Sequence, residues 1–82
     1  MPTVLRVAGF RFYFYGGDHL PAHVHVRNGD GVVVIEIETT KVRRTEGEVR
    51  EKDLTRAKSL VAEHRVLLRN AWDDFERSKG DR

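Results

Sequence analysis

Hydrophobic and polar residues alternate strictly along the first half of this 82-residue chain. In residues 10–15, three phenylalanines share one face, and an arginine and two tyrosines share the other. This period of two predicts a half-buried β-strand. Residues 3–7 form a shorter run of the same kind, and Ala8-Gly9 joins the two runs. Since glycine permits a tight reversal of the backbone, the pattern predicts an opening hairpin.

Alternation resumes after an interruption. Residues 16–21 are rich in glycine and end in a proline, which predicts a loop. Residues 23–27 alternate again, and Asn-Gly-Asp-Gly at 28–31 is a strong hairpin signal before a fourth predicted strand at 32–38. The polar residues 39–50 predict a short ribbon or an irregular connection.

The period changes from two to about 3.6 in the second half of the chain. Apolar residues recur there at alternating three- and four-residue spacing, which predicts one long amphipathic helix over residues 51–78. The stripe comprises Leu54, Ala57, Val61, His64, Leu68, Ala71 and Phe75, and it is widened by Leu60, Leu67 and Trp72. Gly80 is suited to end this helix.

These elements predict an α+β fold. We expect a small antiparallel sheet of three to five strands, built from hairpins and packed on one side by a single long C-terminal helix. The length fits one domain over residues 1–82. A domain this small buries a modest core, so a homodimer is the default expectation.

Composition narrows the class of protein. Hydrophobic residues make up 39% and charged residues 34% of the chain, which is typical of a soluble domain and argues against a membrane span. The chain contains no cysteine, which excludes disulfides and thiolate ligands. The first residues lack the basic and long apolar segments of a secretory signal, so we expect a cytoplasmic protein. The net charge of +2 does not by itself demand nucleic acid.

Alternation divides the predicted sheet into two faces. One helix covers only one face, and the apolar residues of the strands are expected there: Phe10, Phe12, Phe14, Val24, Val26, Val33, Ile35 and Ile37. The opposite face would be open. It would collect Arg11, Tyr13, Tyr15, His23, His25, Arg27, Glu36 and Glu38.

The histidines are concentrated between residues 18 and 25. In a strand, His23 and His25 point the same way about 6.6 Å apart, close enough to hold one metal ion or one phosphate. His19 and Asp18 in the loop would complete a set of ligands for a divalent metal such as zinc. Alternatively, these histidines form hydrogen bonds with tyrosine, glutamate or the loop backbone.

Other reactive residues have simpler explanations. His64 lies on the inward stripe of the helix, where a histidine usually satisfies a backbone group. Trp72 and Phe75 are expected in the core or in a dimer contact. A basic cluster at Lys41, Arg43 and Arg44 is a candidate phosphate patch, although a solvated turn explains it more simply.

The order of these motifs resembles a known family. The opening Met-Pro-Thr-Val, the strand at 9–15, Asp18-His19, Pro21 and His-Val-His-Val at 23–26 are similar to the small bacterial domain-of-unknown-function family number 4160. The segments Glu63-His64-Arg65, Leu67-Leu68 and Ala71-Trp72 resemble that family's ending, whereas Ala22 stands where the family prefers proline. The resemblance implies a compact stand-alone bacterial protein, often encoded in pairs that look like toxin and antitoxin, and therefore a small protein partner.

Three functions fit these residues. The first is a binding or regulatory module that grips a partner protein or nucleic acid on the open face. Its binding residues would be Arg11, Tyr13, Tyr15, Asp18, His19, Arg27 and Glu36. The second is a metal-independent endoribonuclease with His23 and His25 as acid and base. The third is a divalent-metal site of His19, His23 and His25, either structural or hydrolytic.

Overall fold

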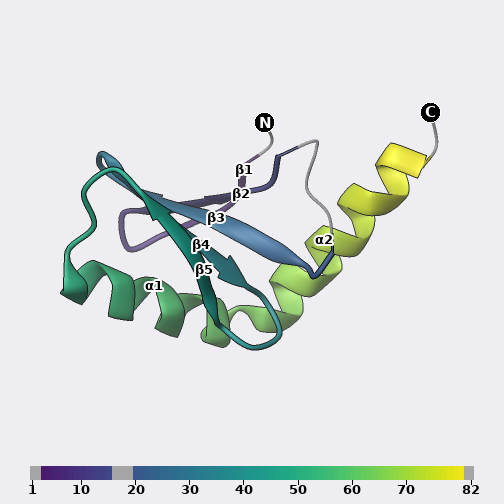
Figure 1. Ribbon diagram of the computed structural model, residues 1–82. Helices are drawn as coiled ribbons and strands as arrows, with labels where there is room; N and C mark the ends of the chain where they lie inside the picture. The colour runs from purple at the N-terminus through teal and green to yellow at the C-terminus, as the bar shows by residue number, and fades with distance from the viewer. Residues whose placement is uncertain (1–2, 16–19, 81–82) are drawn as a thin grey trace.

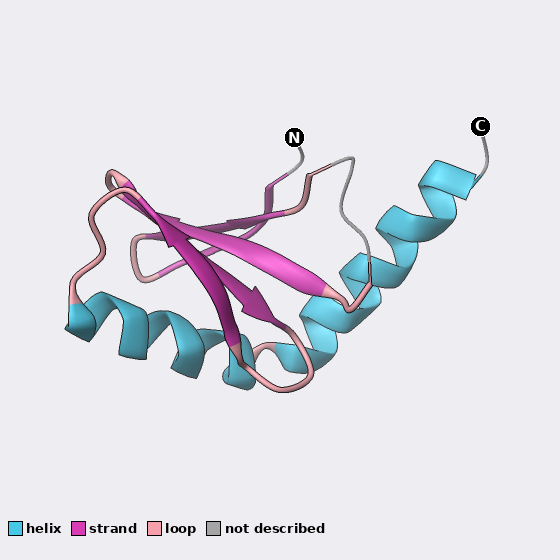
Figure 2. Ribbon diagram, viewed as in Figure 1, coloured by secondary structure: helices cyan, strands magenta, loops and turns pink. Residues whose placement is uncertain are grey.

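The computed structural model describes residues 3–15 and 20–80, with the backbone alone at residues 79 and 80. Five strands form one antiparallel sheet in the order β1-β2-β3-β4-β5, followed by two helices (Figures 1 and 2). The strands are β1 (Thr3–Val7), β2 (Phe10–Tyr13), β3 (His23–Asn28), β4 (Gly31–Glu36) and β5 (Val42–Glu46), and the helices are α1 (Glu51–Glu63) and α2 (Arg65–Gly80). The α+β fold predicted from the sequence is confirmed.

Tight turns connect the first strands as the sequence predicts. Ala8 and Gly9 join β1 to β2 with φ values of 54° and 82°. Positive φ at both positions is the type I′ form, whose twist matches that of the flanking strands. Gly29, with φ of 63°, lies in the turn between β3 and β4. Strand order therefore follows chain order throughout the sheet.

The polar segment at 39–50 contains the fifth strand. Strand β5 pairs with β4 from Val32↔Glu46 to Ile35↔Val42, with an irregularity in register between Val34 and Ile35. Its residues are largely exposed, so the apolar alternation that reveals the other strands is missing. Only a short ribbon or irregular connection was predictable there.

The core lies between one face of the sheet and the two helices. All eight strand residues predicted for this face belong to the buried cluster. The helices contribute Ala57, Leu60, Val61, Leu68 and Trp72. The predicted division of the strands into an apolar and a polar face is therefore confirmed for the apolar face.

The prediction of one continuous helix is wrong at His64. There φ is −106° and ψ is 24°, which separates α1 from α2. The His64 ring stabilises this break, because its Nδ1–H donates to the Leu60 carbonyl oxygen at 2.9 Å. The change of direction leaves Val66 and Leu67 68% and 43% exposed, so Leu67 is not part of the core stripe.

The break also determines where α2 lies. Helix α1 runs beneath the sheet, whereas α2 passes the end where β3 begins and extends beyond the sheet (Figure 1). No helix among the described residues is long and apolar enough to cross a membrane.

Candidate functional site

The sheet face opposite the core is closed rather than open around the histidines. His25 and Tyr13 are each 1% exposed and His23 is 6% exposed. Val32 and Val34 are buried on the same face. The expectation that Tyr13, His23 and His25 are exposed is therefore wrong, although alternation does place them on the predicted side.

Aromatic contacts account for part of this burial. The His25 ring stacks on Tyr13 with 5.4 Å between centroids and an interplanar angle of 16°. Tyr15 packs edge-on against His25, with 4.5 Å between centroids. Tyr13 and His25 are directly opposite in the register of β2 and β3, where side chains of neighbouring strands pack closely. The two tyrosines and His25 therefore form one cluster.

His23 connects this cluster to helix α2. Its ring lies 5.7 Å from that of His25 and 5.5 Å from that of Trp72. The His23 Nδ1–H donates to the Pro21 carbonyl oxygen at 2.9 Å, which fixes the ring. Trp72 also packs edge-on against Phe14 of the core, 5.3 Å away. Because α2 passes the end of the sheet, one tryptophan contacts side chains from both faces.

Burial also changes the acid–base behaviour of Tyr13. Desolvation raises the pKa of its phenol, and the neighbouring Tyr15 adds to the shift, while Arg27 opposes it. The phenol is therefore neutral at physiological pH. Tyr13 acts as a packing residue rather than a surface for stacking a ligand.

Three arginines form a row across the same face. Arg6 is opposite Arg11 in the pairing of β1 with β2, and Arg11 is opposite Arg27 in the pairing of β2 with β3. Neighbouring strands lie about 4.8 Å apart, so the row crosses three strands within about 10 Å. Arg6 and Arg27 are exposed and Arg11 is half-buried. We refer to Arg6, Arg11 and Arg27 as the arginine row.

Sequence reasoning identified Arg11 and Arg27 as binding residues but missed Arg6. The length of the first turn is the sequence feature that could have identified Arg6. A two-residue turn at Ala8-Gly9 pairs Val7 with Phe10 and then Arg6 with Arg11, which is the observed register. Counting outward from the turn therefore places Arg6 beside Arg11 from the sequence alone.

The charge of the arginine row is only partly offset. Like charges directly opposite on neighbouring strands destabilise a sheet. The Arg11 guanidinium lies 4.9 Å from the Tyr13 ring centroid, and the Arg27 Nε–H donates to the Gly29 carbonyl oxygen at 3.3 Å. In the described part of the chain, no carboxylate forms an ion pair with any of the three. Within the described residues, the Arg11 and Arg27 guanidinium groups are therefore held by an aromatic ring and a backbone carbonyl rather than by carboxylates.

The acidic residues expected beside these arginines are engaged elsewhere. Glu36, half-buried and opposite His23, accepts a hydrogen bond from the Thr39 hydroxyl at 3.0 Å. Glu38 turns to α2 and accepts two bonds from Arg69, at 2.6 and 2.7 Å. This bidentate contact lowers the pKa of Glu38. Glu38 lies beyond the end of β4, and its carboxylate is bound to α2 rather than to the arginines of the sheet.

The metal hypothesis gains no support from the residues that can be placed. His19, which the metal site requires, and Asp18, a further candidate ligand, lie outside the described residues. Within the described ranges, no three metal-ligating side chains come together. Of the basic cluster, Arg44 pairs with Glu46 at 3.1 Å, which explains part of it as surface charge on β5.

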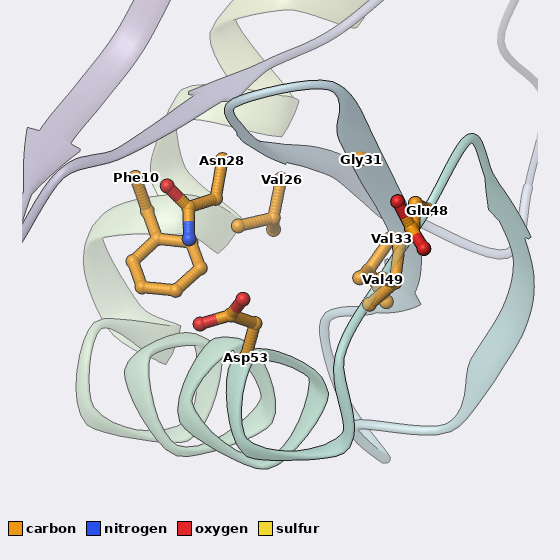
Figure 3. A pocket seen from close by; sticks show the side chains of 8 residues that line it. All are labelled: Phe10, Val26, Asn28, Gly31, Val33, Glu48, Val49 and Asp53. Carbon is orange, nitrogen blue, oxygen red and sulfur yellow. The ribbon is translucent and has the colours of Figure 1, made fainter.

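A small cavity lies between the sheet and the start of α1. It is lined by Phe10, Val26, Asn28, Gly31, Val33, Glu48, Val49 and Asp53 (Figure 3). Its volume of about 10 Å³ is enough for roughly one water molecule. A binding site for a small organic molecule is far larger, about 300 Å³ or more. This cavity is not a candidate active site.

Comparison with known proteins gives a family. A family model described as "Domain of unknown function (DUF4160)" matches residues 9–73. The chain belongs to this family. In this DUF4160 protein the matched segment includes both strand histidines and Trp72. It begins after the end of β1, so Arg6 lies outside it. No curated protein and no solved structure matches the chain.

Proposed function

We propose that this DUF4160 protein is a binding module that holds a single strand of nucleic acid, with RNA as the first candidate. The arginine row carries the proposal. Arg6, Arg11 and Arg27 lie side by side on three adjacent strands, and no described carboxylate neutralises them. Guanidinium groups bind phosphate oxygens with two parallel hydrogen bonds, so a row of them suits a phosphate backbone.

The position of Tyr15 favours a single-stranded nucleic acid, whose bases are accessible for stacking. This tyrosine is 39% exposed and is the exposed member of the aromatic cluster with Tyr13 and His25. A tyrosine packed against two other rings loses little freedom when it stacks on a base. Such stacking contributes about 1 to 3 kcal/mol per base. Arg11, Arg27 and Tyr15 therefore keep their predicted binding roles, whereas Tyr13 has a supporting one.

Burial of the histidines favours binding over catalysis. A general acid or base must come within hydrogen-bond reach of the reacting atoms. His25 is 1% exposed and His23 is 6% exposed, and both rings pack against other aromatic rings. We therefore assign them to the support of the surface and expect bound RNA to stay intact.

The resemblance in the sequence suggests a cellular setting. We propose a bacterial cytoplasmic protein that works beside a small protein partner, in a pair similar to a toxin and its antitoxin. A nucleic-acid-binding module is compatible with such a pair, since many regulatory proteins act by binding nucleic acid. This setting is independent of the arginine row and is tested separately, by co-purification of the protein with its genomic neighbour.

Fluorescence anisotropy with a labelled 12-nucleotide single-stranded RNA tests the binding function. With three phosphate contacts, the logarithm of the association constant should fall with the logarithm of salt concentration with a slope of about −2. Arg6→Gln and Arg27→Gln should each weaken binding at low salt and reduce that slope by about 0.7. Arg56→Gln, which alters an exposed arginine on α1, is the matched control and should change neither value.

Two results would contradict the proposal. Equal affinity for the wild type and both row variants would remove the arginine row from the interface. Affinity that does not change with salt would exclude a phosphate contact as the basis of binding. Electrophoresis of the RNA after incubation checks for cleavage, which would favour the nuclease alternative.

A further inference from the structure

The sheet has two edges, and they differ in chemistry. Strand β5 carries Arg43, Arg44 and Glu46 among its five residues, and all three are exposed. Charged side chains of this kind protect an edge strand from pairing with another chain. Strand β1 has one charge, Arg6, between the half-buried apolar residues Leu5 and Val7. The β1 edge therefore carries fewer charges than the β5 edge, and its register is regular from Leu5 to Val7, beyond an irregularity between Thr3 and Leu5.

The geometry of the first hairpin determines which backbone groups β1 presents. In a two-residue hairpin the residues that flank the turn, here Val7 and Phe10, form a hydrogen-bonded pair. Hydrogen-bonded and non-hydrogen-bonded pairs alternate along antiparallel strands, so Arg6 and Arg11 form a non-hydrogen-bonded pair. The N–H and C=O groups of Arg6 therefore point away from β2, toward the free edge.

The charge of Arg6 determines which kind of added strand could form hydrogen bonds with its backbone N–H and C=O groups. A strand added beside β1 would place one side chain directly next to Arg6, as the fourth member of the arginine row. A carboxylate there would relieve the repulsion between Arg6 and Arg11. A second copy of β1 would join two arginine rows into one, which increases the repulsion. The occupant that fits is an acidic strand from a different protein.

We propose that β1 is the docking edge for an extended acidic segment of a partner protein, which adds a sixth antiparallel strand with a carboxylate beside Arg6. Backbone hydrogen bonds to Arg6 supply the attachment, and the arginine row supplies the selectivity for acidic sequences. This inference goes beyond the proposed nucleic-acid binding, because it adds a strand at the edge of the sheet, and Arg6 takes part in both proposals.

The test uses a cyclic β-hairpin peptide whose outer strand reads Val-Glu-Val-Glu-Val. Titration into ¹⁵N-labelled protein should shift the amide resonances of β1 and slow hydrogen exchange at Arg6. A matched peptide with lysine in place of glutamate should not bind. Methylation of the peptide nitrogen that faces Arg6 removes one hydrogen bond but no charge, and it should weaken binding by roughly 3- to 10-fold.

Two protein variants complete the design. Arg6→Glu should reverse the preference, so that the lysine peptide binds better than the glutamate peptide. Arg43→Glu on β5 is the control and should leave the preference unchanged. Equal binding of both peptides, no shift at millimolar peptide, or no effect of N-methylation would each overturn the proposal. Dimerisation of the protein alone, detected by sedimentation and accompanied by slowed hydrogen exchange at Arg6, would overturn it in favour of a second copy.

Discussion

The loss of stability on truncation of His25 to alanine distinguishes a buried structural role for this histidine from a role as an exposed catalytic residue. The imidazole is 1% exposed and contacts three rings, those of Tyr13, Tyr15 and His23. An exposed catalytic histidine would contribute little to stability. A buried one leaves a cavity and removes ring contacts when it is truncated.

The expected magnitude follows from this environment. Truncation of a buried aliphatic side chain to alanine costs about 2 to 5 kcal/mol, and that of a large aromatic about 3 to 5 kcal/mol. Imidazole is smaller than a phenyl ring, so we expect His25→Ala to lower the free energy of unfolding by about 2 to 4 kcal/mol. The whole domain has roughly 4 to 12 kcal/mol of stability, on a scale of about 0.05 to 0.15 kcal/mol per residue. The melting temperature should therefore fall by roughly 10 to 30 °C.

Urea unfolding followed by circular dichroism measures this loss, together with thermal melting. Val66→Ala is the control, because Val66 is 68% exposed and its truncation should change stability by less than about 0.5 kcal/mol. A loss below about 1 kcal/mol for His25→Ala, with an unchanged denaturant slope, would refute the reasoning. The histidine would then have to be accessible, and the catalytic hypothesis would regain its basis.

Two further predictions concern an ion pair and a turn. In Arg69→Met, NMR titration should show the pKa of Glu38 rising toward its ordinary value, whereas Arg77→Met should leave it unchanged, because Arg77 pairs with Asp74. Since the folded-state pKa of Glu38 is lowered, the pair's stabilisation is present above the ordinary glutamate pKa and is lost as the pH falls, so Arg69→Met should flatten the acid limb of the stability profile. Ala8→Asn creates the Asn-Gly pair favoured in type I′ turns and should raise stability in urea unfolding by about 0.5 to 1 kcal/mol. Gly9→Ala, at φ of 82°, should lower it by about 1 kcal/mol, and the opposite order of effects would contradict the assigned turn.

The strands of the first half were predictable because apolar and polar residues alternate along them with a period of two. Phe12, Val24 and Ile35 come from three different strands, yet alternation alone assigns all three to the core. Strand β5 was not predictable in the same way. Its side chains are mostly exposed, and an edge strand rich in charged residues resembles a polar loop in sequence.

The break at His64 and the burial of His23 share one physical origin. Helical periodicity continues through residue 64, so the sequence pattern carries no sign of a change in direction. That change brings Trp72 to the start of β3, where it covers His23. The alternation argument, which assigns side chains to a covered and an open face, assumes that a helix covers only one side of a sheet. It fails where a helix passes the end of the sheet and contacts both sides.

The buried histidines and the arginine row form parts of one arrangement. His23 packs on Trp72, His25 packs on His23, and Tyr13 stacks on His25. The Arg11 guanidinium in turn lies over Tyr13. A ring held by this packing offers a fixed platform for a guanidinium, and a cation on an aromatic face gains about 0.5 to 2 kcal/mol. The histidine motif therefore supports Arg11 from beneath through Tyr13. In the proposed function, the arginines rather than the histidines make the contacts with the bound strand.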